Sequence, residues 1–238
     1  MEENNNYPKH IAIIPDGNRR WARKHKLEVW LGHKKGAENF EKIVDVAIEF
    51  NVSHISFWGS SKDNLVKRPA NEVKFLLNLF KDKFVSLSGD ERVHKNQIRI
   101  NVIGEWREQF PSDVQVSINQ AIEATKNYDK YFLNFFLAYS GTSEILNAIK
   151  CIAEKQRKDG SLSMDGKLLK SCLLTSELPE VDLMIRTGGE PHLSDGFMMW
   201  DTANTQLYFS DKLWPDFGKK DFRDAIIDYS KRQRRFGK

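Results

Sequence analysis

The chain has 238 residues, of which 40% are hydrophobic and 29% are charged, and its formal net charge is +4. This composition is typical of a globular protein with a substantial core, and it gives no reason to expect nucleic-acid binding. The sequence shows no bilayer-spanning apolar run and no signal-peptide pattern. Because Cys151 and Cys172 are the only cysteines and have no CxxC spacing, we expect neither zinc nor a disulfide, and a reducing cytoplasmic location.

Short apolar runs of strand length alternate with amphipathic helical stretches along the chain. Strands are predicted at 10–16, 54–59, 97–104, 131–138, 182–187 and 206–210, and helices at 34–50, 70–87, 113–126, 142–157, 166–172 and 219–234. This alternation predicts one α/β domain at 10–238, with a mainly parallel six-stranded sheet covered by helices on both faces. Residues 1–9 are polar and are expected to form a disordered tail.

The first predicted strand ends at a carboxylate that is followed by a glycine and two arginines. In HIAIIPDGNRRWA, Asp16 ends the strand, Gly17 forms the turn, and a helix carrying Arg19 and Arg20 begins. Free N–H groups at a helix N-terminus, together with arginines, favour a phosphorylated ligand. Asp16 would repel such a ligand, so the arrangement also indicates Mg²⁺ between them. An ordinary strand–turn–helix with solvated charges is the alternative for this segment alone.

Polar residues also follow the second and fifth predicted strands. They are Ser60, Asn64 and Arg68 after the second strand, and Arg186, Gly188, Gly189, His192 and Ser194 after the fifth. Ligands of open α/β sheets bind outside the carboxyl ends of the strands, so we expect these loops to converge on one crevice for two anionic groups. No Walker A, GxGxxG or GxSxG motif supports a nucleotide or serine-hydrolase site. His33 heads the next helix, either as a capping group or as a phosphate or proton-passing group.

The helix predicted at 70–87 has large apolar residues on more than one face. They are Phe75, Leu76, Leu77, Leu79, Phe80 and Phe84. Ordinary core packing is the default explanation for such a pattern. Beside an anion site, the same pattern also suits a tunnel for a long hydrocarbon tail.

Together these motifs resemble the cis-prenyltransferases of the undecaprenyl diphosphate synthase family. The resemblance covers about residues 10–237 and rests on HIAIIPDGNRRWA at 10–22, GHKKGAE at 32–38, SSKDNLVKRPANEV at 60–73, DLMIRTGGEPHLS at 182–194, LYFSDKLWPDF at 207–217 and RRFG at 234–237. It implies an enzyme that condenses isopentenyl diphosphate with an allylic prenyl diphosphate and releases diphosphate. It also implies the family fold with its hydrophobic tunnel, Mg²⁺ dependence and a homodimer. A long prenyl product would draw this cytoplasmic enzyme transiently to a membrane surface.

The resemblance also assigns roles to matching residues. Asp16 is implied as the catalytic aspartate that works with Mg²⁺, and Asn64 as the asparagine that helps to remove a proton from isopentenyl diphosphate. The implied substrate-binding residues are Gly17, Asn18, Arg19, Arg20, Trp21, His33, Ser60, Arg68, Glu72, Arg186, His192, Ser194, Arg235 and Gly237. Arg235 and Gly237 match a C-terminal segment that reaches the partner subunit's site.

Several positions depart from the family pattern, mainly on the isopentenyl side. His192 replaces a usual arginine, so the isopentenyl diphosphate pocket lacks a fixed positive charge, and Gly196 is an apparent insertion. Gln206 replaces a glutamate as the second Mg²⁺ partner, which makes it a poorer ligand. We therefore expect weaker isopentenyl diphosphate binding, and two alternatives stay open: irregular prenyl transfer to another acceptor, or a non-catalytic partner subunit. Trp58 is expected to face the tunnel and to shorten the product.

Overall fold

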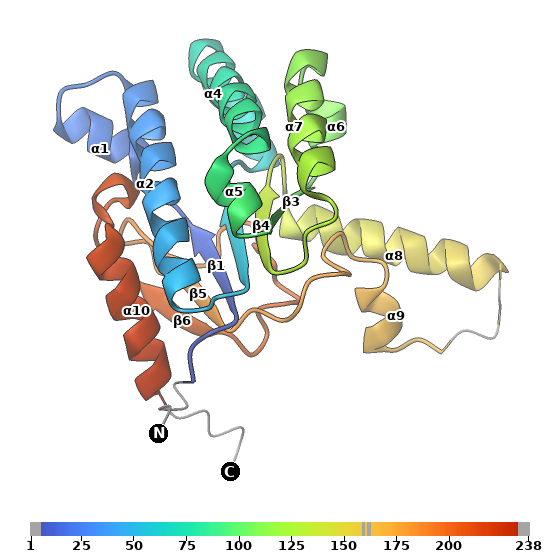
Figure 1. The fold of residues 1–238 in the computed structure, drawn as a ribbon. Helices are drawn as coiled ribbons and strands as arrows, with labels where there is room; N and C mark the ends of the chain where they lie inside the picture. Colours follow the sequence, from blue (N-terminus) through green and yellow to red (C-terminus); the bar gives the residue numbers. More distant parts are fainter. Residues whose placement is uncertain (1–5, 159, 161–162, 233–238) are drawn as a thin grey trace.

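A computed structural model describes residues 6–158, 160 and 163–232 (Figure 1). Its centre is a six-stranded sheet in which all neighbouring strands are parallel, in the order β3-β4-β2-β1-β5-β6. The strands are β1 (His10–Ile14), β2 (His54–Trp58), β3 (Ile98–Ile103), β4 (Tyr131–Phe136), β5 (Leu183–Arg186) and β6 (Gln206–Phe209). Each lies within its predicted range, so the predicted α/β class and parallel sheet are confirmed.

The predicted helices are also found, but α2 begins at Val29, so His33 lies within this helix and does not head or cap it. The helices are α1 (Asn18–Lys24), α2 (Val29–Glu49), α3 (Lys62–Lys67), α4 (Ala70–Ser88), α5 (Glu91–Lys95), α6 (Trp106–Gln109), α7 (Ser112–Thr125), α8 (Gly141–Lys158), α9 (Gly166–Lys170), α10 (Lys219–Lys231) and the 3-10 turn η1 (Trp214–Asp216). The sequence did not predict α3, α5 and α6, whose four to six residues give little of a 3.6-residue period; α9 is equally short but lies within the longer predicted range 166–172.

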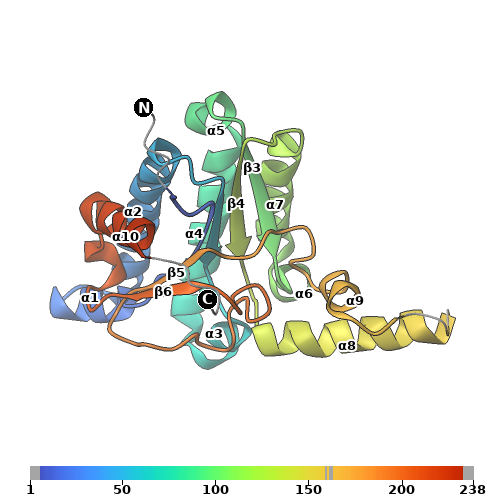
Figure 2. The same ribbon diagram turned by 90° about the horizontal axis from the view of Figure 1, so that it is seen from below.

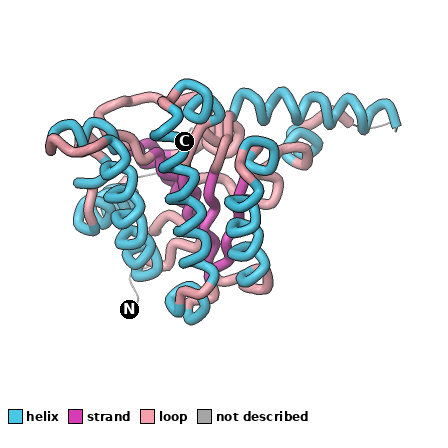
Figure 3. Tube along the Cα trace, turned by 90° about the horizontal axis from the view of Figure 1, so that it is seen from above, coloured by secondary structure: helices cyan, strands magenta, loops and turns pink. Residues whose placement is uncertain are grey.

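The two faces of the sheet are covered differently. On the first face, Ile11 and Ile13 belong to a core cluster that includes buried residues of α2, α4, α7 and α10. Figure 3 shows helices lying in a layer against the strands. On the second face, Ala12 and Met184 pack against residues of irregular connections, among them Phe197. α8 projects away from the body of the molecule (Figure 2). The first face is therefore the one where a cavity between helices and sheet can form.

Trp58 ends β2 on the second face. Its ring stacks on Phe197, with the ring centroids 5.1 Å apart, and both residues belong to the second-face cluster. Side chains alternate along a strand, so the neighbouring Phe57 faces the helices instead. The expectation that Trp58 faces the tunnel is therefore wrong, and the short product inferred from it loses its support.

Residues that precede β1 already contact the rest of the domain. The ring of Tyr7 packs on Phe50 at a centroid distance of 4.9 Å, and the Lys9 N–H donates to Asp182 Oδ2 over 2.8 Å. Residues 1–5 of the expected tail lie outside the described residues. Within the described part of the chain, no helix combines the length and the apolar character that crossing a membrane requires.

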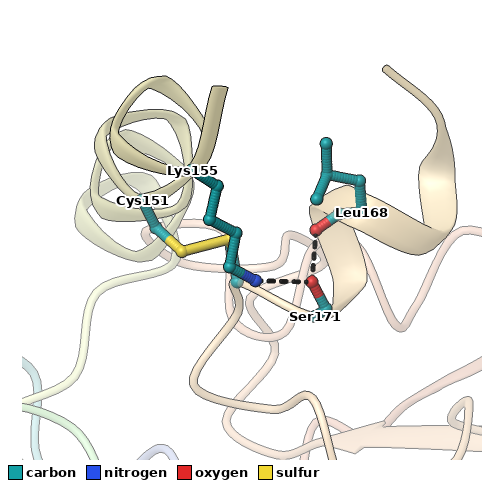
Figure 4. Close-up of a disulfide and its surroundings, with 5 residues drawn as sticks. Cys151, Lys155, Leu168 and Ser171 are labelled. Atoms are coloured by element: carbon teal, nitrogen blue, oxygen red, sulfur yellow. Dashed lines mark hydrogen bonds between the residues drawn. A yellow bond between two sulfur atoms is a disulfide. The ribbon is translucent and has the colours of Figure 1, made fainter. Parts of the chain in front are cut away.

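Cys151 on α8 and Cys172, just after α9, form a disulfide (Figure 4). Their Cα atoms lie 5.9 Å apart, although 21 residues separate them in sequence. Beside the bond, Lys155 Nζ donates to Ser171 Oγ over 3.0 Å. The expectation of no disulfide is therefore wrong. Sequence spacing excluded a cysteine motif, but it could not show that α9 folds back against α8.

Reduction of this disulfide is expected to destabilise the fold. Closing a loop of this length removes unfolded-state entropy worth roughly 3 kcal/mol. For a chain of this size, the melting temperature should fall by roughly 6–12 °C. Thermal unfolding of the wild type with and without dithiothreitol measures the change. The Cys151→Ser/Cys172→Ser variant should match the reduced wild type and ignore the reductant; equal melting temperatures for all samples would contradict the prediction.

Candidate active site

The turn from β1 into α1 forms one wall of a crevice. Gly17 adopts a φ of 113°, and a Cβ atom there would lie 2.9 Å from Leu213, so this close turn requires glycine. The crevice has a volume of about 250 Å³ and is lined by Pro15, Asp16, Gly17, Asn18, Arg19, Arg20, Arg23, His33 and Arg68. The sequence did not predict Arg23, although its spacing of four residues from Arg19 places both on one face of α1.

Asp16 lies between two arginines. Its Oδ2 is 3.0 Å from Arg186 Nη2, and its Oδ1 is 3.2 Å from Arg20 Nη2. β1 pairs with β5 so that Ile14 lies opposite Arg186, which brings the end of β5 beside Asp16. Thr187 Oγ1 also donates to the Asp16 carbonyl over 2.8 Å. Strand pairing therefore holds the carboxylate at the mouth of the crevice, as the sequence predicted.

A second group of site residues surrounds Glu72, which is 5% exposed. The carboxylate of Glu72 lies 3.1 Å from His33 Nε2, 3.3 Å from Arg68 Nη1 and 3.6 Å from Arg19 Nε. Arg68 also donates to Asn64 Oδ1. These contacts join α1, α2, α3 and the start of α4. Burial, and secondly the charge of Arg68, lower the pKa of His33 to about 4, so this histidine is neutral at pH 7.

The loop after β5 brings the predicted isopentenyl-side residues to the same place. Arg186 Nη1 donates to the His192 carbonyl and lies 3.2 Å from His192 Nδ1. The Ser194 N–H donates to that Nδ1 over 3.1 Å. Positive φ angles occur at Ser194, Asp195 and Met198 as well as at Gly196. Such unfavourable backbone, clustered beside a crevice, is typical of ligand-binding loops.

Four predicted site residues lie elsewhere or outside the description. Ser60 Oγ accepts a hydrogen bond from the Ala138 N–H over 3.0 Å and is buried. Trp21 Nε1 donates to Asp216 Oδ1 over 2.7 Å and does not line the crevice. Arg235 and Gly237 lie outside the described residues.

Gln206 is not brought together with Asp16. It is the first residue of β6 and lies opposite Leu183, which lies opposite Ile11 of β1. Asp16 follows the last residue of the same strand, so the parallel strands place the two residues toward opposite ends of the sheet. Among the described residues, Gln206 Oε1 has no hydrogen-bond partner. Within this chain, Gln206 therefore cannot share a metal with Asp16.

An apolar cavity of about 310 Å³ lies between α2, α4 and the first face of the sheet. Pro15, Asn18 and His33 line both this cavity and the crevice, so the two are adjacent. Most of the cavity lining is apolar and includes Phe40, Val44, Phe57, Leu76, Phe80, Phe84, Leu133 and Phe135. The predicted tunnel thus has a counterpart on the side of α4, next to the anion site.

The chain is similar to known proteins over nearly its whole length. Residues 14–237 match a family model described as "Putative undecaprenyl diphosphate synthase". The chain is 42% identical over 234 residues to the tritrans,polycis-undecaprenyl-diphosphate synthase (geranylgeranyl-diphosphate specific) of Pyrococcus horikoshii, covering 97% of this chain and 87% of that protein. It is 41% identical to the Thermoplasma acidophilum protein of the same name, covering 100% and 93%.

Two crystal structures are also similar. The lavandulyl diphosphate synthase of Lavandula x intermedia, in complex with dimethylallyl diphosphate, has a TM-score of 0.91 and 33% identity, covering 98% of this chain and 99% of that one. A probable undecaprenyl diphosphate synthase from Campylobacter jejuni has a TM-score of 0.78 and 30% identity, covering 98% and 100%. These findings confirm the resemblance carried by the motifs. The chain therefore belongs to the undecaprenyl diphosphate synthase family and is a cis-prenyltransferase.

Proposed function

We propose that the chain condenses isopentenyl diphosphate with an allylic prenyl diphosphate to form a cis-polyprenyl diphosphate and releases diphosphate. One observation carries this proposal: the arginine-lined crevice at Asp16 adjoins the apolar cavity through Pro15, Asn18 and His33. A diphosphate with a hydrocarbon tail needs these two environments side by side.

The residues of the crevice suit the ionisation of an allylic diphosphate. Negative charge grows on the leaving diphosphate, where the N-terminus of α1 and the guanidinium groups of Arg19 and Arg20 can stabilise it. The opposite charge develops on the hydrocarbon, which the apolar cavity shields from water. Arg186, held by Asp16 and the His192 carbonyl, is placed to bind the diphosphate of the second substrate.

We include Mg²⁺ in the proposal on the basis of the donor set. Asp16 is the acidic side chain that lines the crevice, and its side chain is 34% exposed. The described residues contain no group of three or more His, Cys, Asp or Glu that could hold a metal. Mg²⁺ commonly takes one or two carboxylates together with substrate phosphates, so Asp16 fits an ion that binds with the substrate. The ion would neutralise charge on the diphosphate.

We propose that Asn64 helps to remove the proton of isopentenyl diphosphate. Its Oδ1 accepts a hydrogen bond from Arg68, which also contacts Glu72. This contact ties Asn64 to Arg68, which is one of the side chains that line the crevice.

His192→Arg is expected to strengthen isopentenyl diphosphate binding. The His192 side chain is 59% exposed and lies beside Arg186, so an arginine there would add a permanent positive charge without burying it. A charge-assisted hydrogen bond is worth about 1.5–3 kcal/mol, or roughly a tenfold or greater fall in KM. Steady-state kinetics with varied isopentenyl diphosphate measure this KM. An unchanged KM would remove His192 from the second-substrate site.

We propose geranylgeranyl diphosphate as the allylic starter, because the archaeal relatives are named as specific for it. Incubation with labelled isopentenyl diphosphate, Mg²⁺ and starters of different length, followed by chromatography, tests this choice. No labelled product from any starter would reject the reaction. Product formed from an allylic diphosphate alone would instead indicate irregular coupling, an alternative favoured by the altered loop at His192 and by the likeness to lavandulyl diphosphate synthase.

We also propose a homodimer, formed through the second face of the sheet. Leu207 and Phe209 of the edge strand β6 point to this face and are 40% and 39% exposed. Trp200 is similarly exposed, and α8 presents Leu146 and Ile149. Exposed apolar side chains on an edge strand need a partner surface. Light scattering should show a dimer in the wild type and a monomer in Leu207→Asp/Phe209→Asp.

A cytoplasmic location remains part of the proposal. The Cys151–Cys172 disulfide is unusual for a reducing compartment. Labelling of free thiols in protein extracted under acid quench would show whether the bond forms in the cell.

A further inference from the structure

The turn between α1 and α2 concentrates positive charge. From Arg19 to Lys35 the sequence has seven Lys or Arg residues and one acidic residue, Glu28, in a chain with a net charge of only +4. Arg19 and Lys35 form ion pairs. Four further cations, all exposed, have no ion pair within the described part of the chain: Arg23, Lys24, Lys26 and Lys34.

Other described cations, including Lys95 and Lys130, also have no ion pair, whereas three cations of α10 have one. Cations of α10 are neutralised by nearby carboxylates: Lys219 by Asp45, Lys220 by Asp224 and Arg223 by Glu49. Crevice arginines other than Arg23 are likewise held by Asp16 or Glu72. The α1–α2 turn is therefore a local concentration of positive charge in which four cations have no ion pair within the described residues.

Apolar side chains lie among these cations. Leu27 and Leu31 are 42% and 37% exposed. Trp30 is half-buried and contacts Phe75 of α4, with ring centroids 6.2 Å apart. Exposed leucines with a tryptophan between lysines are typical of protein surfaces that enter the interface of a bilayer.

One of these side chains, that of Trp30, lies on the helix face of α2 that lines the cavity further along, although Trp30 itself is not a lining residue. On α2 the cavity is lined by His33, Ala37, Phe40, Val44 and Ile48, which follow one another at helical spacing. Trp30 precedes His33 by three residues and therefore lies at the outer end of the same stripe. Figure 1 shows the α1–α2 turn and the start of α4 at the same end of the molecule.

We propose that residues 23–31, with Lys34 and Phe75, dock the protein on a bilayer that contains anionic lipids; we call this surface the basic corner. The cations attract the headgroups, and Leu27, Leu31 and Trp30 enter the interface. This proposal rests on the proposed function in one respect: a prenyl product is the reason why the protein would need a membrane. Docking there would hold the end of the cavity that adjoins the crevice close to a bilayer able to take up a hydrocarbon product.

Vesicle sedimentation of the full chain without substrates tests the charged part of the basic corner. The wild type should bind phosphatidylcholine vesicles that contain phosphatidylserine, and salt should weaken the binding. Lys24→Glu/Lys26→Glu should lower the partition coefficient roughly tenfold or more, since each cation near an anionic surface contributes about a fivefold factor.

The matched control is Lys95→Glu/Lys130→Glu, which makes the same change in charge. Both control lysines are exposed and lie just before β3 and β4, at the opposite end of the sheet. This variant should bind vesicles within about twofold of the wild type, because its charges lie beyond the Debye length from the docked surface. Equal losses in both variants would overturn the proposal, since binding would then follow net charge alone.

The apolar part of the basic corner is tested by Leu27→Ser/Leu31→Ser. This variant should bind vesicles more weakly than the wild type at every salt concentration, and its binding should depend on salt as steeply as that of the wild type. A wild type that ignores anionic vesicles, or that binds duplex DNA or RNA in their place, would overturn the proposal. Because binding is measured without substrates, its result is independent of the reaction. A chain that binds vesicles but forms no prenyl product would support the basic corner and reject the proposed function.

Discussion

Asp16→Asn is expected to lower kcat by more than a hundredfold while the fold stays intact. Asp16 is the carboxylate of the crevice, and it contacts Arg20 and Arg186 from the two sides of the site. The amide keeps the shape but loses the charge that would hold Mg²⁺ and orient both arginines. Losing preorganised charge stabilisation of this kind costs about 3–4 kcal/mol in the transition state, which is a factor of hundreds in rate.

Initial rates at saturating concentrations of both substrates, measured over a range of Mg²⁺ concentrations, test this expectation. The matched control is Asp216→Asn, which removes another carboxylate near α1, the one that accepts from Trp21 Nε1 outside the crevice. The control should retain kcat within about threefold, because it touches no substrate group. Near-normal turnover of Asp16→Asn would reject the assignment of Asp16, and a matching loss in the control would point to structural damage.

The site around Asp16 could be predicted from the sequence because it is local. Asp16, Gly17 and the first residues of α1 are consecutive in the sequence. An apolar run of strand length, a glycine at the turn and the start of a helical pattern were therefore enough to place them. The loop after β5 joined them because parallel strands present their carboxyl ends at one edge. In the structure Ile14 at the end of β1 pairs with Arg186 at the end of β5, so the two strand ends lie side by side.

Other features depend on long-range packing, which no local pattern encodes. The contact of Glu72 with Arg19 joins residues more than fifty positions apart, and the Cys151–Cys172 bond depends on where α9 turns back. Trp58 was placed on the wrong face because the prediction followed a family position; the alternation of β2, His-Ile-Ser-Phe-Trp, puts Trp58 on the side of His54 and Ser56. Gln206 was grouped with Asp16 through the family motif, whereas strand register separates them within one chain.

Glu72→Gln is expected to lower the stability of the free protein. Glu72 is a buried carboxylate with two guanidinium groups, those of Arg19 and Arg68, within 3.6 Å. Removing one partner of a buried ion pair costs about 3–5 kcal/mol. The melting temperature should therefore fall by roughly 6–12 °C or more. Because His33 is neutral at pH 7, the loss comes from the two arginines and not from the histidine.

The substrate should restore part of this loss. Without Glu72, Arg19 and Arg68 repel each other across the crevice, and a bound diphosphate would supply the missing negative charge. The shift in melting temperature caused by an allylic diphosphate should therefore be larger for Glu72→Gln than for the wild type. Glu38→Gln, which alters an exposed ion pair with Lys35 on the same helix as His33, should change stability by less than about 0.5 kcal/mol.

A second substitution shows whether the instability of Glu72→Gln comes from charge repulsion or from lost packing. If repulsion between guanidinium groups causes the instability, Glu72→Gln/Arg19→Met should regain several degrees of melting temperature over Glu72→Gln, because one of the two facing cations is gone. The kcat/KM of the double variant should fall below that of Glu72→Gln, since Arg19 lines the crevice and would be missing from the diphosphate site. A double variant that is less stable than the single one would show that Glu72 acts through packing and hydrogen bonding, and not as the counter-ion of the crevice arginines.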